Sequence, residues 1–327
     1  VFFFLSNIPV YTDTFISVWN TSLPGVSGAN QIRLPLESDG EYNFTVDWGD
    51  GSQSDIIDYS DPEVTHTYAL EGIYEIKIEG EIKGFRFANG GDKEKILEIK
   101  AWGPLNVGNN SAYFQGCRNL KFTGTDTLNL EGTTDLSSMF SSCNKFTGDL
   151  SSWDTSKVED MHMMFASAYE FNSDLSSWDV SSVRNMHWMF LGADKFNSPI
   201  GSWDTSNVET MYYMFYNVDS FNQDLTNWDV SKVDSFSSMF QGAVSFNGDL
   251  SGWDTSGATI MSNMFRGASE FSSELGSWDV SNVEKMNGMF AHTKVNFDMS
   301  SWDTGKVTDM SQMFIGTDYF NGNLSTW

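Results

Sequence analysis

Regularly spaced carboxylates are the side chains of this chain best suited to chemistry. An Asp follows the Trp of segments that recur every 25 residues, with a single step of 24 between Trp278 and Trp302. If the segments stack, neighbouring carboxylates lie about 5 Å apart, and like charges repel unless a cation bridges them. Ca²⁺ prefers carboxylate oxygens, so a Ca²⁺-binding column is one hypothesis. Its members are Asp154, Asp179, Asp204, Asp229, Asp254, Asp279 and Asp303.

A local structural role for these carboxylates is the alternative, and we favour it. Each Asp can accept a hydrogen bond from the backbone two residues later, in an Asx-turn. No D-x-D-x-D-G calcium loop occurs in the sequence. No cofactor is therefore required, although Ca²⁺ is compatible with the pattern. A second acidic set, interrupted by Pro199, comprises Asp149, Asp174, Asp224, Asp249 and Glu274.

The two cysteines, Cys117 and Cys143, occupy equivalent places in consecutive early segments, where later segments carry Ala. Stacked at an inter-strand spacing, they are close enough for a disulfide. The alternative, slightly favoured, is a pair of buried thiols that act as small hydrophobes.

Catalysis has little support in the sequence. The four His have no nucleophile or acid partner at a motif position, and no G-x-S-x-G, H-E-x-x-H or phosphate-binding loop occurs. His162 and His187 fall in a variable position after a Met and are expected at the surface. We therefore expect a protein that is not an enzyme.

Asparagines suggest two further roles. Four lie in N-x-S/T sequons and are candidate N-glycosylation sites: Asn20, Asn43, Asn109 and Asn323. Others recur with the repeat and predict a hydrogen-bonded ladder that satisfies turn backbone: Asn172, Asn197, Asn222, Asn247 and Asn321.

The segments that position these side chains follow the pattern L-x-x-W-D-[TV]-S-x-V-x-x-M-x-x-M-F-x-x-A-x-x-F-N. A fixed period between 20 and 50 residues is typical of stacked coils that share one core. Val158, Phe165 and the Met residues between them fall on one face of a helix, and Ser156 stands at its N-cap with Glu159 as capping-box partner. We therefore predict coils of strand, short helix and turn. W-D-T coils alternate with W-D-V coils, which suggests growth by doubling.

The residues before the repeat predict strands. Asn43 to Ser52 alternate between apolar and polar and end in an Asp-Gly turn, in which Asp50 has a turn role. We expect an N-terminal extended segment at 1–11, a β-sandwich at 12–93 and a solenoid at 94–327. The apolar start is a candidate assembly strand: Val1, Phe2, Phe3, Phe4 and Leu5.

The charge of the chain excludes some partners. Asp and Glu number 44 against 18 Lys and Arg, a formal net charge of -26. Nucleic-acid binding needs a positive surface, so we expect no nucleic-acid partner. No apolar stretch reaches the ~18 residues of a membrane-spanning helix.

Two stretches resemble known families. Tyr42–Ser52, with His66–Tyr68 and Gly72–Tyr74, resembles a polycystic-kidney-disease-type (PKD-like) domain. The Phe114-x-x-Cys117-x-x-Leu120 segment and the W-D-x-S-x-V-x-x-M-x-x-M-F units resemble BspA-like leucine-rich-repeat surface proteins, also called Mycoplasma-lipoprotein-type repeats. The resemblance implies a PKD/Ig-like sandwich followed by an α/β leucine-rich-repeat-like solenoid, located outside the cell or at its surface. It also implies adhesion or matrix contact.

Two functional hypotheses follow. The pattern stops at Trp327 without a polar cap, and an uncapped solenoid end can meet another copy head to tail. The first hypothesis is therefore a structural subunit that assembles end to end into a filament or surface layer. The alternative is a monomeric cell-surface adhesin that binds protein, glycan or matrix through the solenoid face.

Overall fold

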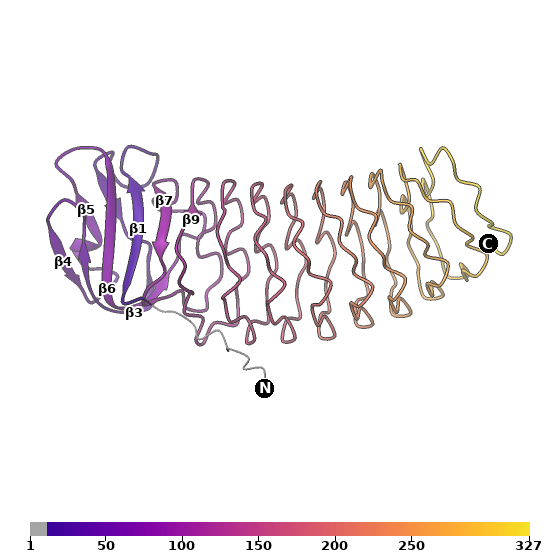
Figure 1. Cartoon of the computed structure of the whole chain (residues 1–327), viewed down its shortest axis with the longest axis horizontal. Helices are drawn as coiled ribbons and strands as arrows, with labels where there is room; N and C mark the ends of the chain where they lie inside the picture. The colour runs from indigo at the N-terminus through magenta and orange to yellow at the C-terminus, as the bar shows by residue number, and fades with distance from the viewer. Residues whose placement is uncertain (1–11) are drawn as a thin grey trace, which may run out of the picture.

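The computed structural model describes residues 12–327 and shows an elongated molecule that is mostly β in character (Figure 1). The candidate assembly strand, Val1 to Leu5, lies outside the described residues. The elements, in chain order, are β1 (Thr14–Asn20), β2 (Gln31–Arg33), β3 (Leu36–Asp47), β4 (Gln53–Ile56), the 3₁₀ turn η1 (Pro62–Val64), β5 (Thr65–Thr67), β6 (Ile73–Phe85), β7 (Ile96–Ala101), β8 (Leu105–Asn106) and β9 (Lys121–Phe122).

One sheet joins the N-terminal strands to the first coils. Its strand order is β4-β3-β6-β1-β7-β9, with β8 paired to β6, while β2 and β5 form a separate two-stranded sheet. β1 pairs antiparallel with both β6 and β7, whereas β7 pairs parallel with β9. The sheet therefore changes from antiparallel to parallel at β7, and it includes strands on both sides of the predicted boundary between residues 93 and 94.

After β9 the chain forms narrow coils that stack along the long axis as far as the C-terminus (Figure 1). Parallel bridges join equivalent residues of successive coils, such as Asp135 with Asp160 and Asp160 with Asn185. The predicted stacking is thus confirmed. The predicted helix in each coil is wrong: among residues 12–327 the one helical element is the 3₁₀ turn η1.

Backbone conformation explains why no helix forms. Met163 and Ser167 both have positive φ, 55° and 59°, and the equivalent residues of the other coils share this left-handed conformation. A right-handed helix cannot pass through such residues. The N–H groups of Met161, Met163 and Phe165 instead donate to carbonyls of the next coil at 2.9–3.1 Å. The N–H groups of Met164 and Ala168 donate to the carbonyl three residues earlier, within tight turns of the same coil.

Apolar columns fill the interior. The Phe of each Met-Phe pair stacks on its equivalents, as in Phe165–Phe190 at 5.7 Å and Phe190–Phe215 at 5.7 Å between ring centroids. The Phe six residues later packs against it within the same coil, at 3.9 Å for Phe165–Phe171. These rings are fully buried. The core is therefore continuous from coil to coil, as the period predicts.

The alternation of Thr and Val sorts the coils into pairs. Thr155, Thr205 and Thr255 each donate to the Asp carbonyl of the following Val coil, at 2.8–2.9 Å. Tryptophans stack within the same pairs, Trp153 on Trp178 and Trp203 on Trp228, both at 6.2 Å. The structural unit is thus a pair of coils, which agrees with the predicted doubling.

Candidate functional site

The Asp after each Trp lies in an Asx-turn. Each carboxylate accepts a hydrogen bond from the backbone N–H two residues later, at 2.9–3.1 Å for the seven turns. Hydrogen bonds from the Ser side chain and backbone lower the pKa of Asp179, Asp229 and Asp279. These groups are therefore anions with a structural task, as the favoured interpretation states.

The second acidic set has a similar task. Asp149, Asp174 and Asp249 accept a hydrogen bond from the Ser backbone two residues later, at 2.8–2.9 Å. The backbone N–H of Asp249 in turn donates to Asp224 of the preceding coil at 2.9 Å. Within residues 12–327 no group of three or more His, Cys, Asp or Glu is arranged to hold a metal ion. In the described residues the carboxylates of this column are engaged in turn hydrogen bonds, and Ca²⁺ binding by them stays a prediction.

The predicted Asn ladder is present. The backbone N–H groups of Asn197, Asn222 and Asn247 each donate to the side-chain oxygen of the Asn one coil earlier, at 2.8–3.0 Å. The ladder continues to the N–H of Ser272, and the N–H of Asn321 bonds to Asn296. Each rung thus satisfies a turn amide of the next coil.

Removing one rung is expected to cost about 1 kcal/mol of unfolding free energy, because the Asn247 amide loses its acceptor. The variant is Asn222→Ala, measured by urea unfolding followed by circular dichroism. Asn227→Ala is the matched control, since Asn227 is an exposed Asn of the same coil with no side-chain hydrogen bond within the described residues. Equal stability of the two variants would show that the Asn222 rung does not contribute to the free energy of unfolding.

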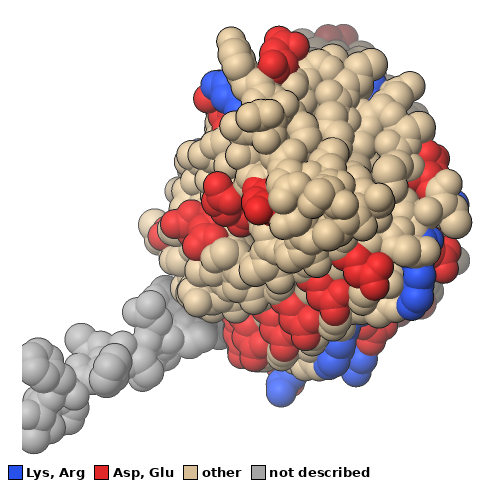
Figure 2. Space-filling model, turned by 90° about the vertical axis from the view of Figure 1, so that its right-hand side faces the viewer, with Lys and Arg blue, Asp and Glu red and all other residues tan. Residues whose placement is uncertain are grey.

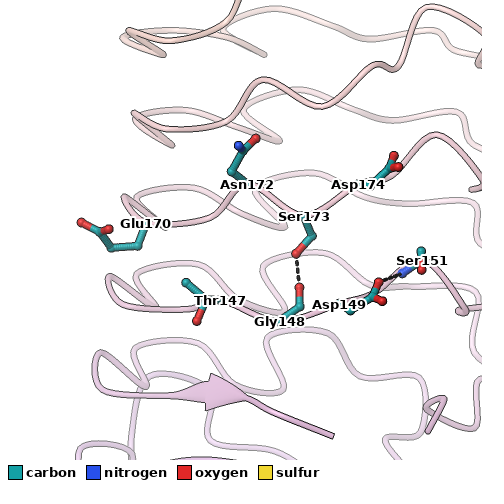
Figure 3. Close-up of a pocket in the computed structure, with 8 residues that line it drawn as sticks. All are labelled: Thr147, Gly148, Asp149, Ser151, Glu170, Asn172, Ser173 and Asp174. Carbon is teal, nitrogen blue, oxygen red and sulfur yellow. Dashed lines mark hydrogen bonds between the residues drawn. The ribbon is translucent and has the colours of Figure 1, made fainter. Parts of the chain in front are cut away.

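An open groove lies between two coils beside the start of this ladder (Figure 3). Its polar groups already serve the turns: Ser173 donates to the carbonyl of Gly148, Asp149 accepts from the backbone of Ser151, and Glu170 pairs with Lys195. The lining residues are Thr147, Gly148, Asp149, Ser151, Glu170, Asn172, Ser173 and Asp174. The groove is open to solvent, and its lining contains neither His nor Cys.

The two cysteines are free thiols in the structure and not the disulfide that was one of the two predictions. Both are fully buried, and the Cys143 thiol donates to the carbonyl of Phe114 at 3.0 Å. Burial raises the pKa of both thiols, so neither is a reactive thiolate. They pack as small hydrophobes, as the alternative states.

Asp50 and His66 have the only carboxylate–His contact that the structure describes in the N-terminal strands. His66 Nε2 lies 2.9 Å from Asp50, and its ring stacks on Trp48 at 4.7 Å. Burial opposes ionisation of Asp50, but hydrogen bonds from Ser52 and His66 outweigh it and lower its pKa to about 2. Asp50 also accepts from the backbone of Ser52 at 3.0 Å, which is the predicted turn role.

The four sequon asparagines differ in accessibility. Asn43 is exposed on β3, and Asn323 is exposed in the last coil, where its side chain accepts from the backbone of Ser325. Asn20 is half-buried at the end of β1. Asn109 is exposed, but its side-chain oxygen accepts from the backbones of Thr134 and Asp135 at 2.8 and 2.9 Å. Asn43 is thus the best placed of the four for modification.

Besides these hydrogen-bond networks, the surface of the molecule has two further features. Seen from the C-terminal end, acidic side chains form a run along one side of the molecule (Figure 2). Elsewhere, aromatic side chains gather on the outside of three consecutive coils, around the stacked rings of His162 and His187. The sequence prediction placed these two His at the surface but did not identify the cluster. Its signal was the change from Ser to aromatic residues in the slots that follow the Met.

The repeat pattern assigns the chain to a family. The model of the family described as "Mycoplasma protein of unknown function, DUF285" matches residues 85–196, 108–228, 173–273 and 248–327. These overlapping matches span 85–327, well over half of the chain, and the chain belongs to this family. No curated protein and no solved structure matches it. No helix in the described residues is long and apolar enough to cross a membrane.

Proposed function

We propose that this protein is a non-catalytic, extracellular interaction protein: a rigid solenoid that holds a long polar surface for contact with partners outside the cell. One observation carries the proposal. The recurring side chains able to do chemistry are used in internal bonds, with the Asp residues in Asx-turns and the Asn residues in the ladder. The outer surface is left as a repetitive surface for contact, as in other solenoids.

The N-terminal strands fit this role as a cap. We infer a PKD-like sandwich, on the basis of the Tyr42–Ser52 motif, and a leucine-rich-repeat-like solenoid after it. β1 covers the first coil by pairing with β7. On the far side the sheet ends in β4, a short strand with the polar residues Gln53, Ser54 and Asp55. That edge has none of the stacked aromatic rings of a coil, which favours the adhesin form over end-to-end filaments.

The test uses the purified chain. We expect a monomer by size-exclusion chromatography with light scattering, single elongated particles by negative-stain microscopy, and binding to immobilised extracellular material. Fibres whose length grows with protein concentration would instead support the structural subunit. Absence of binding to any cell-surface or matrix preparation, together with absence of assembly, would contradict both forms of the proposal.

A further inference from the structure

Six aromatic side chains on the outside of three consecutive coils form what we call the aromatic patch. The rings of His162, His187 and Tyr212 stack in a file, with centroids 4.8 and 4.7 Å apart and planes within 15°. Trp188 stands nearly perpendicular to this file, 5.5 Å from His187. Tyr213 and Tyr216 complete the patch, at 6.2 Å from Trp188 and 5.4 Å from Tyr213 respectively. All six side chains are partly exposed, so they lie outside the core.

The fold does not require aromatic residues at these places. The slot of His162, His187 and Tyr212 holds Ser or Asn in other coils: Ser137, Ser237, Ser262, Asn287 and Ser311. The slot of Trp188 and Tyr213 holds Ser138, Met163, Ser238, Asn263, Gly288 and Gln312. The coils fold without an aromatic residue in either slot, so the aromatic residues serve a purpose other than folding.

The backbone conformation at Trp188 and Tyr213 also indicates that these aromatic residues are not required for folding. Trp188 and Tyr213 have φ of 59° and 58°, a left-handed conformation that bulky residues adopt at a cost in stability. Asn263 and Gly288 fill the same slot elsewhere, and Asn and Gly tolerate this conformation best. Large rings are thus kept where the backbone disfavours them, on an exposed surface, which points to recognition.

The His and Tyr residues of the patch have polar tips that are available to a ligand. His162 and His187 each direct Nδ1 to a side-chain oxygen, of Asp160 at 2.8 Å and of Asn185 at 2.5 Å, which turns Nε2 away from these partners. Within the described residues neither Nε2 atom has a hydrogen-bond partner, and the same holds for the hydroxyls of the three Tyr. A Tyr hydroxyl both donates and accepts. The patch therefore combines apolar ring surface with free hydrogen-bonding groups.

We propose that the aromatic patch is a binding site for an uncharged oligosaccharide. Sugars carry apolar C–H faces beside hydroxyl groups, the combination that aromatic rings with polar tips can match. The net charge of -26 disfavours anionic glycans and nucleic acids. Three coils span about 10 Å, the length of a disaccharide, whereas a stable protein partner covers about 800 Å² on each side. This inference rests on the proposed function, since it names the ligand of one surface of the interaction protein.

Two serine variants test the site in the full chain. Trp188→Ser and Tyr213→Ser introduce the residue that the same slot carries naturally at Ser138 and Ser238, so both are expected to fold. Asn263→Ser is the matched control in that slot, outside the patch. The probes are neutral oligomers of glucose, N-acetylglucosamine, mannose and galactose, screened as an array. The binding oligomer is then titrated by calorimetry and by acrylamide quenching, because Trp188 is partly exposed while most other Trp are buried.

We expect the native chain to bind at least one neutral oligomer and to be protected from quenching. Trp188→Ser and Tyr213→Ser should weaken binding roughly tenfold or more, with Asn263→Ser unchanged and all three showing native circular dichroism. Variants that bind like the native chain overturn the site. Binding of the native chain to a protein or matrix preparation but to no neutral oligomer overturns the oligosaccharide and leaves the proposed function standing. Absence of binding to any of these overturns both.

Discussion

Replacing Phe215 by Ala is expected to lower the free energy of unfolding by about 3–5 kcal/mol. Phe215 is fully buried in the middle of the solenoid. Its ring lies 4.0 Å from Phe221 of the same coil, 5.7 Å from Phe190 of the coil before and 5.4 Å from Phe240 of the coil after. Alanine removes these contacts and leaves a cavity that the stacked coils on both sides hold open.

Urea unfolding followed by circular dichroism measures the loss. Phe215→Leu is the control, because a smaller change of shape and volume should cost less than about half as much as alanine. Each coil contacts only its neighbours, so a weak coil in the middle can also separate the unfolding of the two halves. A broadened or two-step transition is therefore expected for the Ala variant. Losses for Ala and Leu that are equal and small would contradict a tightly packed Phe column.

The repeat pattern predicted those features that depend on one position within a coil. Trp and Phe columns in the core, Asx-turns after each Trp and the Asn ladder all follow from residues that recur at the same place. Stacking identical coils brings identical residues together, so the period alone determines these contacts. Membership of the family rests on the same pattern.

The helix prediction failed because apolar spacing does not report the sign of φ. Val158, Met161 and Phe165 do face one core, but the backbone between them passes through Met163 in a left-handed conformation. The sequence carried one signal of a left-handed backbone. Gly192, Asn217, Gly242 and Gly267 recur four residues before the second core Phe of their coils, and all four have positive φ. Those residues tolerate that conformation best.

The pairing of strands that are distant in the sequence could not be predicted for a different reason. β1 pairs with β7 across about 80 residues of sequence, and strand alternation tells which face of a strand is buried but not which strand lies beside it. The aromatic patch is a different case, because His162, His187 and Tyr212 share one slot of three successive coils and the period alone brings them together. Its signal was present in the sequence, in residues that depart from the repeat pattern.

A second large effect is expected at the junction of sheet and solenoid, where Asp92→Ala should cost about 3–5 kcal/mol. Asp92 and Lys95 are fully buried with their charges 3.9 Å apart. Asp92 accepts from the backbones of Ser27 and Arg33 at 3.0 and 2.8 Å, and Lys95 donates to the carbonyls of Gly28 and Gln31 at 2.8 and 2.9 Å. This network links residues 27–33, which include β2, to the connection between β6 and β7.

Removing Asp92 alone leaves the Lys95 ammonium buried without its counter-charge, and burial already lowers the pKa of Lys95. The double variant Asp92→Ala/Lys95→Met removes both charges and should therefore recover part of the loss, because a buried ion pair contributes less than the cost of breaking it on one side. Thermal and urea unfolding of the native chain, both single variants and the double variant form a complete cycle. Strictly additive losses in that cycle would show that Asp92 acts through its backbone hydrogen bonds alone and that the buried pair does not couple the two segments.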